Sequence, residues 1–149
     1  CEIIPQGVSL ALSIRELVRQ GYLFGAVVLV RSLVERAAVV SHLEENPEAI
    51  ALWKDGWRHR ERPTLLQMLQ AMHHDHPDQA KVVVATLNHI THGDPLGAGF
   101  NLVALGDDGL GHAVGKVLNA PDLCDFICFQ AYCYLIILKV RAELIFPNA

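Results

Sequence analysis

Two residues near position 90 have side chains that could act together in acid–base chemistry. Asn88 and His92 stand four residues apart, so on a helix they share one face. A polar side chain one turn before a histidine can orient the imidazole, and such a histidine can act as acid and base in phosphodiester cleavage. The alternative is structural, because a histidine followed by Gly93 fits the capped end of a helix. The sequence leaves both roles open for His92.

A second pair lies within the apolar segment 22–42. Arg31 and Glu35 are four residues apart and can form an ion pair along one face of a helix. If the pair is buried it fixes helix register, and removing one partner costs on the order of 3 to 5 kcal/mol. Alternatively, Arg31 turns toward His92 and supplies a cation for charge developing on a phosphate. We expect the structural pair and keep Arg31, Asn88 and His92 as candidate catalytic residues.

The most basic run of the chain lies at 58–62 and contains Arg58, Arg60 and Arg62. Beside Trp57, these arginines could hold phosphate or stack on a nucleic-acid base. A charge run between two short helices is more often solvated surface. Acids also outnumber bases by 16 to 12, which argues against a broad nucleic-acid footprint. RNA contact is therefore the lesser prediction for this run.

Histidines supply the only cluster with metal-ligand side chains. Residues 73–76 read His-His-Asp-His, and His89 and His92 follow. Consecutive residues in a turn rarely converge on one ion, and the chain has no HExxH spacing. We predict a solvated turn, with no metal and no cofactor. Three cysteines within 124–133 favour helix packing over disulfide bonds and indicate a reducing, cytoplasmic setting.

The elements that must position these side chains are helical. Apolar residues recur at helical spacing in five segments with approximate bounds: 8–20, 22–43, 65–73, 78–91 and 121–144. Asn46, a good N-cap followed by Pro47, predicts a further short helix, and Thr64 predicts the cap of the next. We expect an all-α fold, a bundle of five or six helices that forms one domain over residues 1–149.

A glycine-rich segment interrupts the helices. Six glycines fall between residues 93 and 111, which predicts a loop or a small β-hairpin insertion at about 93–115. Phe100 to Leu105 and Leu110 to Val114 are the expected strands. An isolated hairpin is only marginally stable, so it should lie against helices. The segment has neither a P-loop nor a dinucleotide-binding fingerprint.

The chain is more apolar than a small soluble domain usually is, with 52% hydrophobic residues against about 45 to 50%. The excess predicts a homodimer through an apolar helical face. The apolar centre of the helix expected after Pro121 covers about 22 Å, against about 30 Å of hydrocarbon in a bilayer. We therefore expect a packed core or dimer face and no membrane. The opening residues show no signal-peptide pattern, which again favours the cytoplasm.

The central Arg-Ser-Leu-Val-Glu segment (31–35) and the later Asn-x-x-x-His-Gly segment (88–93) resemble those of HEPN-like domains and related bacterial helical families. The resemblance covers about residues 8–93 and the helix after Pro121. Many HEPN domains are dimeric, metal-independent ribonucleases of toxin–antitoxin, abortive-infection or CRISPR systems. Their signature is an arginine followed four to six residues later by a histidine. Here Asn88 stands where that arginine is wanted.

Two classes of function follow from the resemblance. The missing arginine favours a catalytically silent HEPN-like module that binds a partner protein or ligand in a bacterial defence or toxin–antitoxin setting. The alternative is a ribonuclease toxin with His92 as acid and base, and with Arg31 or the 58–62 arginines holding phosphate. The two classes differ in whether a guanidinium can reach an exposed His92.

Overall fold

A computed structural model describes residues 2–58, 62–92, 102–104, 109–112, 116 and 120–147. Within these residues the chain forms six helices: α1 (Ile3–Arg19), α2 (Leu23–Glu45), α3 (Ala49–Lys54), α4 (Leu65–Met72), α5 (Pro77–Thr91) and α7 (Pro121–Ile145). The predicted all-α bundle of five or six helices is confirmed.

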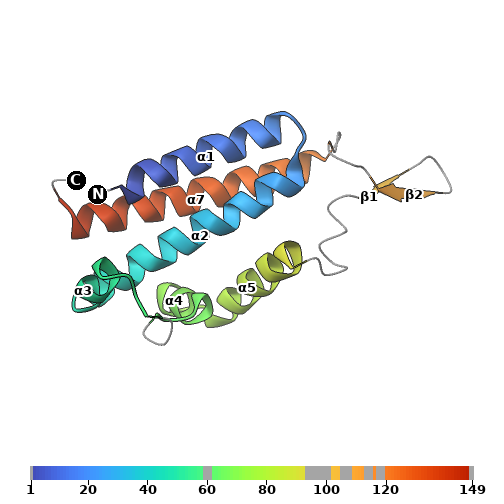
Figure 1. The fold of residues 1–149 in the computed structure, drawn as a ribbon. Coiled ribbons are helices and arrows are strands. Elements are labelled where there is room, and N and C mark those ends of the chain that lie inside the picture. The colour runs from blue at the N-terminus through green and yellow to red at the C-terminus, as the bar shows by residue number, and fades with distance from the viewer. Residues whose placement is uncertain are drawn as a thin grey trace.

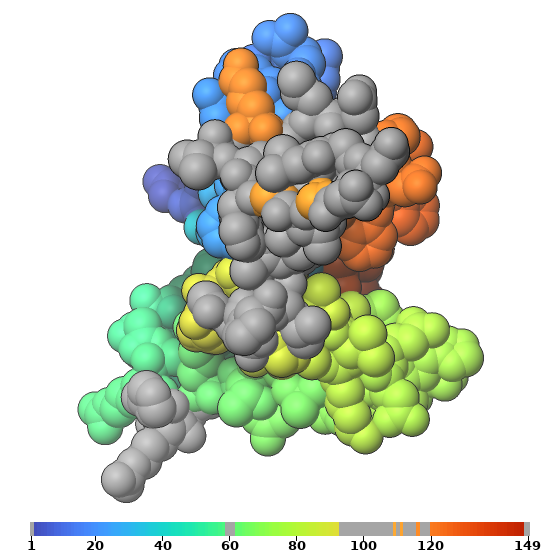
Figure 2. Space-filling model, turned by 90° about the vertical axis from the view of Figure 1, so that its right-hand side faces the viewer, coloured from blue at the N-terminus to red at the C-terminus, as the bar shows by residue number. Residues whose placement is uncertain are grey.

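The bundle is organised around α2. Helices α1 and α7 run alongside α2 and contact both α2 and each other (Figure 1). Helices α4 and α5 also contact α2, on the side away from α1. The end-on view separates these two groups, with α1 (blue) and α7 (orange to red) above and α4 and α5 (green to yellow) below (Figure 2). The centre of α2 is therefore covered from several directions.

The core follows the length of α2. Leu33, Val34, Ala37, Ala38 and Val40 are at most 1% exposed. Small alanines let neighbouring helices approach closely, and the larger side chains fill the remaining space at the density of a protein interior. Among the described residues, Ser41 is the one buried polar side chain, and its hydroxyl donates to the Sδ of Met72 on α4 at 3.4 Å.

Helix α1 begins earlier than the sequence pattern predicted. We expected a start at Val8, whereas α1 starts at Ile3 and includes Pro5. Proline is tolerated there because the first-turn N–H groups have no partner within the helix. After α1, Gly21 has a φ of 82°, and its N–H donates to the carbonyl of Val18 at 2.9 Å. This left-handed glycine turns the chain directly into α2.

Asn46 ends one helix and does not begin the next, so this predicted N-cap is wrong. Its backbone N–H and its side-chain Nδ2 both donate to the carbonyl of His42, each at 2.9 Å. Asn46 therefore caps the C-terminus of α2, and α3 starts only at Ala49. The polar side chain is close to carbonyls that the end of α2 leaves without partners.

The cap predicted at Thr64 is confirmed. The Thr64 Oγ1 accepts from the Gln67 N–H at 3.3 Å, and the Gln67 Oε1 accepts from the Thr64 N–H at 2.8 Å. This reciprocal capping box satisfies two backbone donors at the start of α4. Helix α5 starts with Pro77 at its first position and Asp78 in its first turn. The negative charge of Asp78 is stabilising there because the N-terminal end of the helix dipole is positive.

Two short strands lie between α5 and α7. Strands β1 (Leu102–Ala104) and β2 (Leu110–His112) pair antiparallel, with Val103 opposite Gly111. They fall inside the segments expected to be strands, but a ladder this short does not support a hairpin insertion as an element of the fold. Apart from Gly109, the rest of 93–115 lies outside the described residues. Both strands stand beyond the end of the helices and not against them (Figure 1).

Candidate functional site

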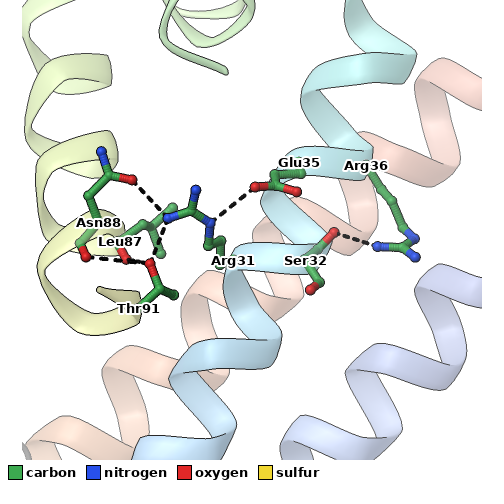
Figure 3. Close-up of polar contacts among 7 residues, drawn as sticks. All are labelled: Arg31, Ser32, Glu35, Arg36, Leu87, Asn88 and Thr91. Carbon is green, nitrogen blue, oxygen red and sulfur yellow. Dashed lines mark hydrogen bonds and ion pairs between the residues drawn. The ribbon is translucent and has the colours of Figure 1, made fainter. Parts of the chain in front are cut away.

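Arg31 is the centre of a polar network that joins α2 to α5 (Figure 3). Its Nε donates to the Oε1 of Glu35 at 3.0 Å, which is the ion pair expected from the spacing. Its Nη1 donates to the Oδ1 of Asn88 and to the Oγ1 of Thr91, each at 2.8 Å. One guanidinium thus has a carboxylate on its own helix and two acceptors on α5.

Thr91 completes the network and was not singled out from the sequence. Its hydroxyl accepts from Arg31 and donates to the Leu87 carbonyl at 2.8 Å. Thr91 lies three residues after Asn88, so both side chains point from one face of α5 toward α2 (Figure 3). A polar i, i+3 pair on an otherwise apolar helix face was the signal that could have identified it.

The Arg31–Glu35 pair is not buried, which corrects the expectation of a buried pair. The side chain of Arg31 is 23% exposed and that of Glu35 is 35% exposed. Water therefore reaches both charges, and the desolvation penalty of a fully buried pair does not apply. The pair holds the guanidinium in place toward α5 and leaves its Nη2 without a hydrogen bond in the part of the chain that the structure describes.

His92 lies at the end of α5, outside the Arg31 network. It is the C-cap residue, its backbone N–H donates to the carbonyl of Asn88 at 2.9 Å, and its side chain is exposed. Arg31 bonds to Thr91, the residue directly before His92, but none of its hydrogen bonds goes to His92. The structure brings together Arg31, Glu35 and Asn88 and leaves the His92 side chain exposed, without a hydrogen bond from its imidazole to any of these three described residues.

Only part of the basic run lies within the described residues, and the backbone N–H of Arg62 donates to the carbonyl of Arg58 at 3.3 Å. Arg58 and Arg62 are exposed, and Arg60 lies outside the described residues. Trp57, which precedes these arginines, packs against the ring of His42, with the two centroids 6.1 Å apart. Contact of this run with RNA stays a prediction.

Arg62 lines a cavity of about 370 Å³ between α1, α2 and α3, together with Arg36 and Trp53. Arg36 points away from the Arg31 network (Figure 3). Its Nη1 donates to the Ser32 carbonyl at 3.0 Å and its Nε donates to the Oε1 of Gln6 at 3.3 Å. Glu2 and Glu35 also line the cavity, so its two arginines face two carboxylates. These opposite charges give the cavity no clear preference for an anion.

The described histidines do not form a metal site. Across the residues that the structure describes, no group of three or more His, Cys, Asp or Glu side chains could hold an ion. His74 makes an exposed contact with Asp75 at 3.2 Å. Burial, and then the charge of His76, lowers the pKa of His73 below its ordinary value of 6.5. Cys124, Cys128 and Cys133 are free thiols.

A broad apolar surface is the feature that sequence reasoning described only in general terms. Large apolar side chains remain 42% to 63% exposed on α1 and α7, and we name this set the outer face: Val8, Leu12, Phe126, Phe129, Tyr132, Ile136, Val140 and Leu144. The α7 members recur every three or four residues, so they follow one side of the helix. Val8, Leu12 and Tyr132 also line a shallow cavity of about 280 Å³ between α1 and α7.

Helix α7 also meets the length and composition expected of a membrane span, as no other described helix does. In its most apolar window, 22% of the residues are buried inside the molecule. Length and apolarity alone are weak evidence for a span, because core helices of soluble proteins share them. The predicted cytoplasmic location stays a prediction.

Comparisons of the chain with protein-family models, with curated proteins and with solved structures gave no match. The HEPN-like resemblance and the defence or toxin–antitoxin setting that it implies therefore stay predictions.

Proposed function

We propose that this chain is a catalytically silent helical module that binds another polypeptide through the outer face. The observation that carries the proposal is the size of that face, which holds eight large apolar side chains. Soluble monomers rarely expose apolar patches larger than a few hundred Å², and larger patches mark interaction sites. Burying these side chains against a partner removes apolar surface from water, which drives association.

The Arg31 network supports a structural role for the polar side chains that α2 and α5 bring together.

 Glu35, Asn88 and Thr91 occupy two of the three guanidinium nitrogens of Arg31, and these bonds tie α5 to α2. A carboxylate beside the guanidinium also competes with any phosphate for its charge. A cation held in this way is suited to fixing two helices relative to each other.

The ribonuclease alternative keeps one specific observation in its favour. Arg31 bonds to Thr91, so its guanidinium lies next to the residue that precedes the exposed His92. In that alternative, Nη2 of Arg31 holds a phosphate oxygen and His92 moves the proton. Glu35 would have to share Arg31 with the phosphate, which weakens this second candidate.

The binding proposal is tested by photo-crosslinking in the producing cells. A benzoylphenylalanine residue replaces Phe129 on the outer face, or Leu52 as a matched control. Leu52 is also a large apolar residue, 46% exposed, but it lies on α3. We expect a covalent adduct with a polypeptide from position 129 and none from position 52. Equal yields at the two positions, or no adduct at either, would contradict the proposal.

The claim of catalytic silence is tested with labelled RNA in the presence of EDTA. We expect neither the wild-type chain nor the His92→Ala variant to cleave it. Cleavage by the wild type that disappears in His92→Ala would overturn the silent module in favour of the ribonuclease. Equal cleavage by both would remove the catalytic role of His92 and point to a contaminating nuclease.

A further inference from the structure

Two residues of opposite charge on α7 lie at equal distances from Tyr132 of the outer face. Asp125 lies seven residues before Tyr132 and Lys139 lies seven residues after it, and all three side chains are exposed. Seven residues are nearly two helical turns, so the three positions follow one line along α7, with each charge about 10 Å from the tyrosine. No charged residue lies between Asp125 and Lys139. The stripe therefore has an apolar centre with Asp125 at one end and Lys139 at the other, where the Lys139 Nζ also lies 3.7 Å from the Oε1 of Glu143.

From this arrangement we infer that the outer face binds the same face of a second copy of this chain, with the two α7 helices antiparallel across a two-fold axis at Tyr132. The inference rests on the proposed function, because it names the partner of that binding surface. An antiparallel pair brings Asp125 of each copy opposite Lys139 of the other. A parallel pair would place Asp125 against Asp125 and Lys139 against Lys139, which is repulsive.

The area of the outer face fits a stable dimer. Its eight side chains are 42% to 63% exposed. At roughly 150 to 200 Å² for a fully exposed side chain of this size, they present on the order of 600 to 850 Å². A specific interface of standard size buries about 800 Å² on each partner. A two-fold pair uses the same patch twice, so a single such face on each chain is sufficient.

Side-chain types across the axis are also self-complementary. Tyr132, 63% exposed, lies on the axis and meets its own copy, and aromatic pairs gain stability beyond the area that they bury. Phe129 of one copy comes within one turn of Ile136 of the other. An apolar centre with a charged rim is the usual anatomy of a protein interface.

The charge on the exposed side of α7 favours a second copy over a lipid surface. Asp122, Asp125 and Glu143 are exposed there, against the single cation Lys139. Helices that lie on membranes carry lysine and arginine on their polar face and are attracted to anionic lipids. Arg141, the other cation of α7, pairs with Glu44 of α2 and is not available to such a surface.

Charge reversal at the two ends of the stripe tests the inference in the full chain. Analytical ultracentrifugation at micromolar concentration should give the wild type a mass of twice 16.4 kDa. Asp125→Lys or Lys139→Asp alone places like charges across both symmetry-related contacts and should weaken the dimer by at least about tenfold. The double variant D125K/K139D restores opposite charges and should recover the wild-type dissociation constant within a few-fold. Asp75→Lys, the same charge change far from α7, should leave it unchanged.

Three results would overturn the inference: a monomeric wild type, single variants that dimerise as tightly as the wild type, or a double variant as weak as the single ones. If the wild type is monomeric and position 129 still crosslinks to another polypeptide, the second-copy inference fails and the binding module stands. If the monomer instead floats with vesicles of phosphatidylcholine and phosphatidylglycerol, and position 129 gives no polypeptide adduct, both fail.

Discussion

Helices α2 and α7 are both long and apolar, but the molecule encloses only one of them. Twelve of the 23 residues of α2 are buried, against five of the 25 residues of α7. The difference follows from side-chain size and neighbours. Helix α2 presents alanine and valine to helices on several sides, whereas α7 packs one side on α1 and α2 and leaves Phe129 and Tyr132 outside. Apolar composition predicts that a helix is covered in the working protein, but it does not tell whether the cover is the rest of the same chain or a partner.

Truncation of a core leucine should have the largest effect on this comparison. Leu33 of α2 is 0% exposed, and Leu33→Ala should lower the free energy of unfolding by about 2 to 5 kcal/mol, because it leaves a cavity. Leu144 of α7 is 63% exposed, and Leu144→Ala should cost about 0.5 kcal/mol or less. Urea denaturation at one low protein concentration measures both without a contribution from association. Similar losses at the two sites would mean that α7 is as enclosed as α2.

Removal of the Arg31 side chain should have an intermediate effect. Arg31→Met loses hydrogen bonds to three partners and leaves Glu35 without its cation, so we expect a loss of about 1 to 3 kcal/mol. Water reaches the exposed part of Glu35 and keeps the cost below that of a fully buried pair. Arg19→Met is the matched control. The Arg19–Glu16 pair is 68% and 49% exposed and screened by water, so its loss should cost clearly less than the loss of Arg31 in the same urea titration.

The smallest expected effect is a pH dependence at His73, where α4 ends beside α2. Because burial lowers the pKa of His73 in the folded chain, the unfolded chain binds the proton more readily. Stability should therefore fall as the pH drops through the unfolded pKa of about 6.5, and the loss should level off below the folded pKa. His73→Gln removes this contribution. Urea titrations between pH 8 and pH 5 should show a shallower decline for His73→Gln than for the wild type, and parallel curves would refute the assignment.

Local patterns predicted the helices well, because each signal lies within a few residues. Thr64 caps α4 through Gln67, only three residues away. The same kind of rule was wrong at Asn46, which satisfies the end of the preceding helix where we expected it to start the following one. An asparagine between two helices can cap the end of the first or the start of the second. Only the arrangement of the two helices decides which cap forms.

The candidate site was predicted in part for the same reason. The spacing of Arg31 and Glu35 indicated their ion pair, since both lie on one helix. The bonds from Arg31 to Asn88 and Thr91 join residues 57 and 60 positions apart, and their geometry depends on how α5 packs against α2. Excess apolarity suggested an interface, but only the packing of α7 against α1 and α2 identified Phe129 and Tyr132 as its exposed part.

The enclosure of α2 has a consequence for synthesis on the ribosome. Helix α2 ends at Glu45, whereas α7, which covers much of it, ends at Ile145. At about 5 to 20 residues per second, a nascent chain waits on the order of 5 to 20 s between the two. During that interval the apolar residues of α2 lack one of their main covers, so the nascent chain exposes apolar surface that the folded molecule encloses.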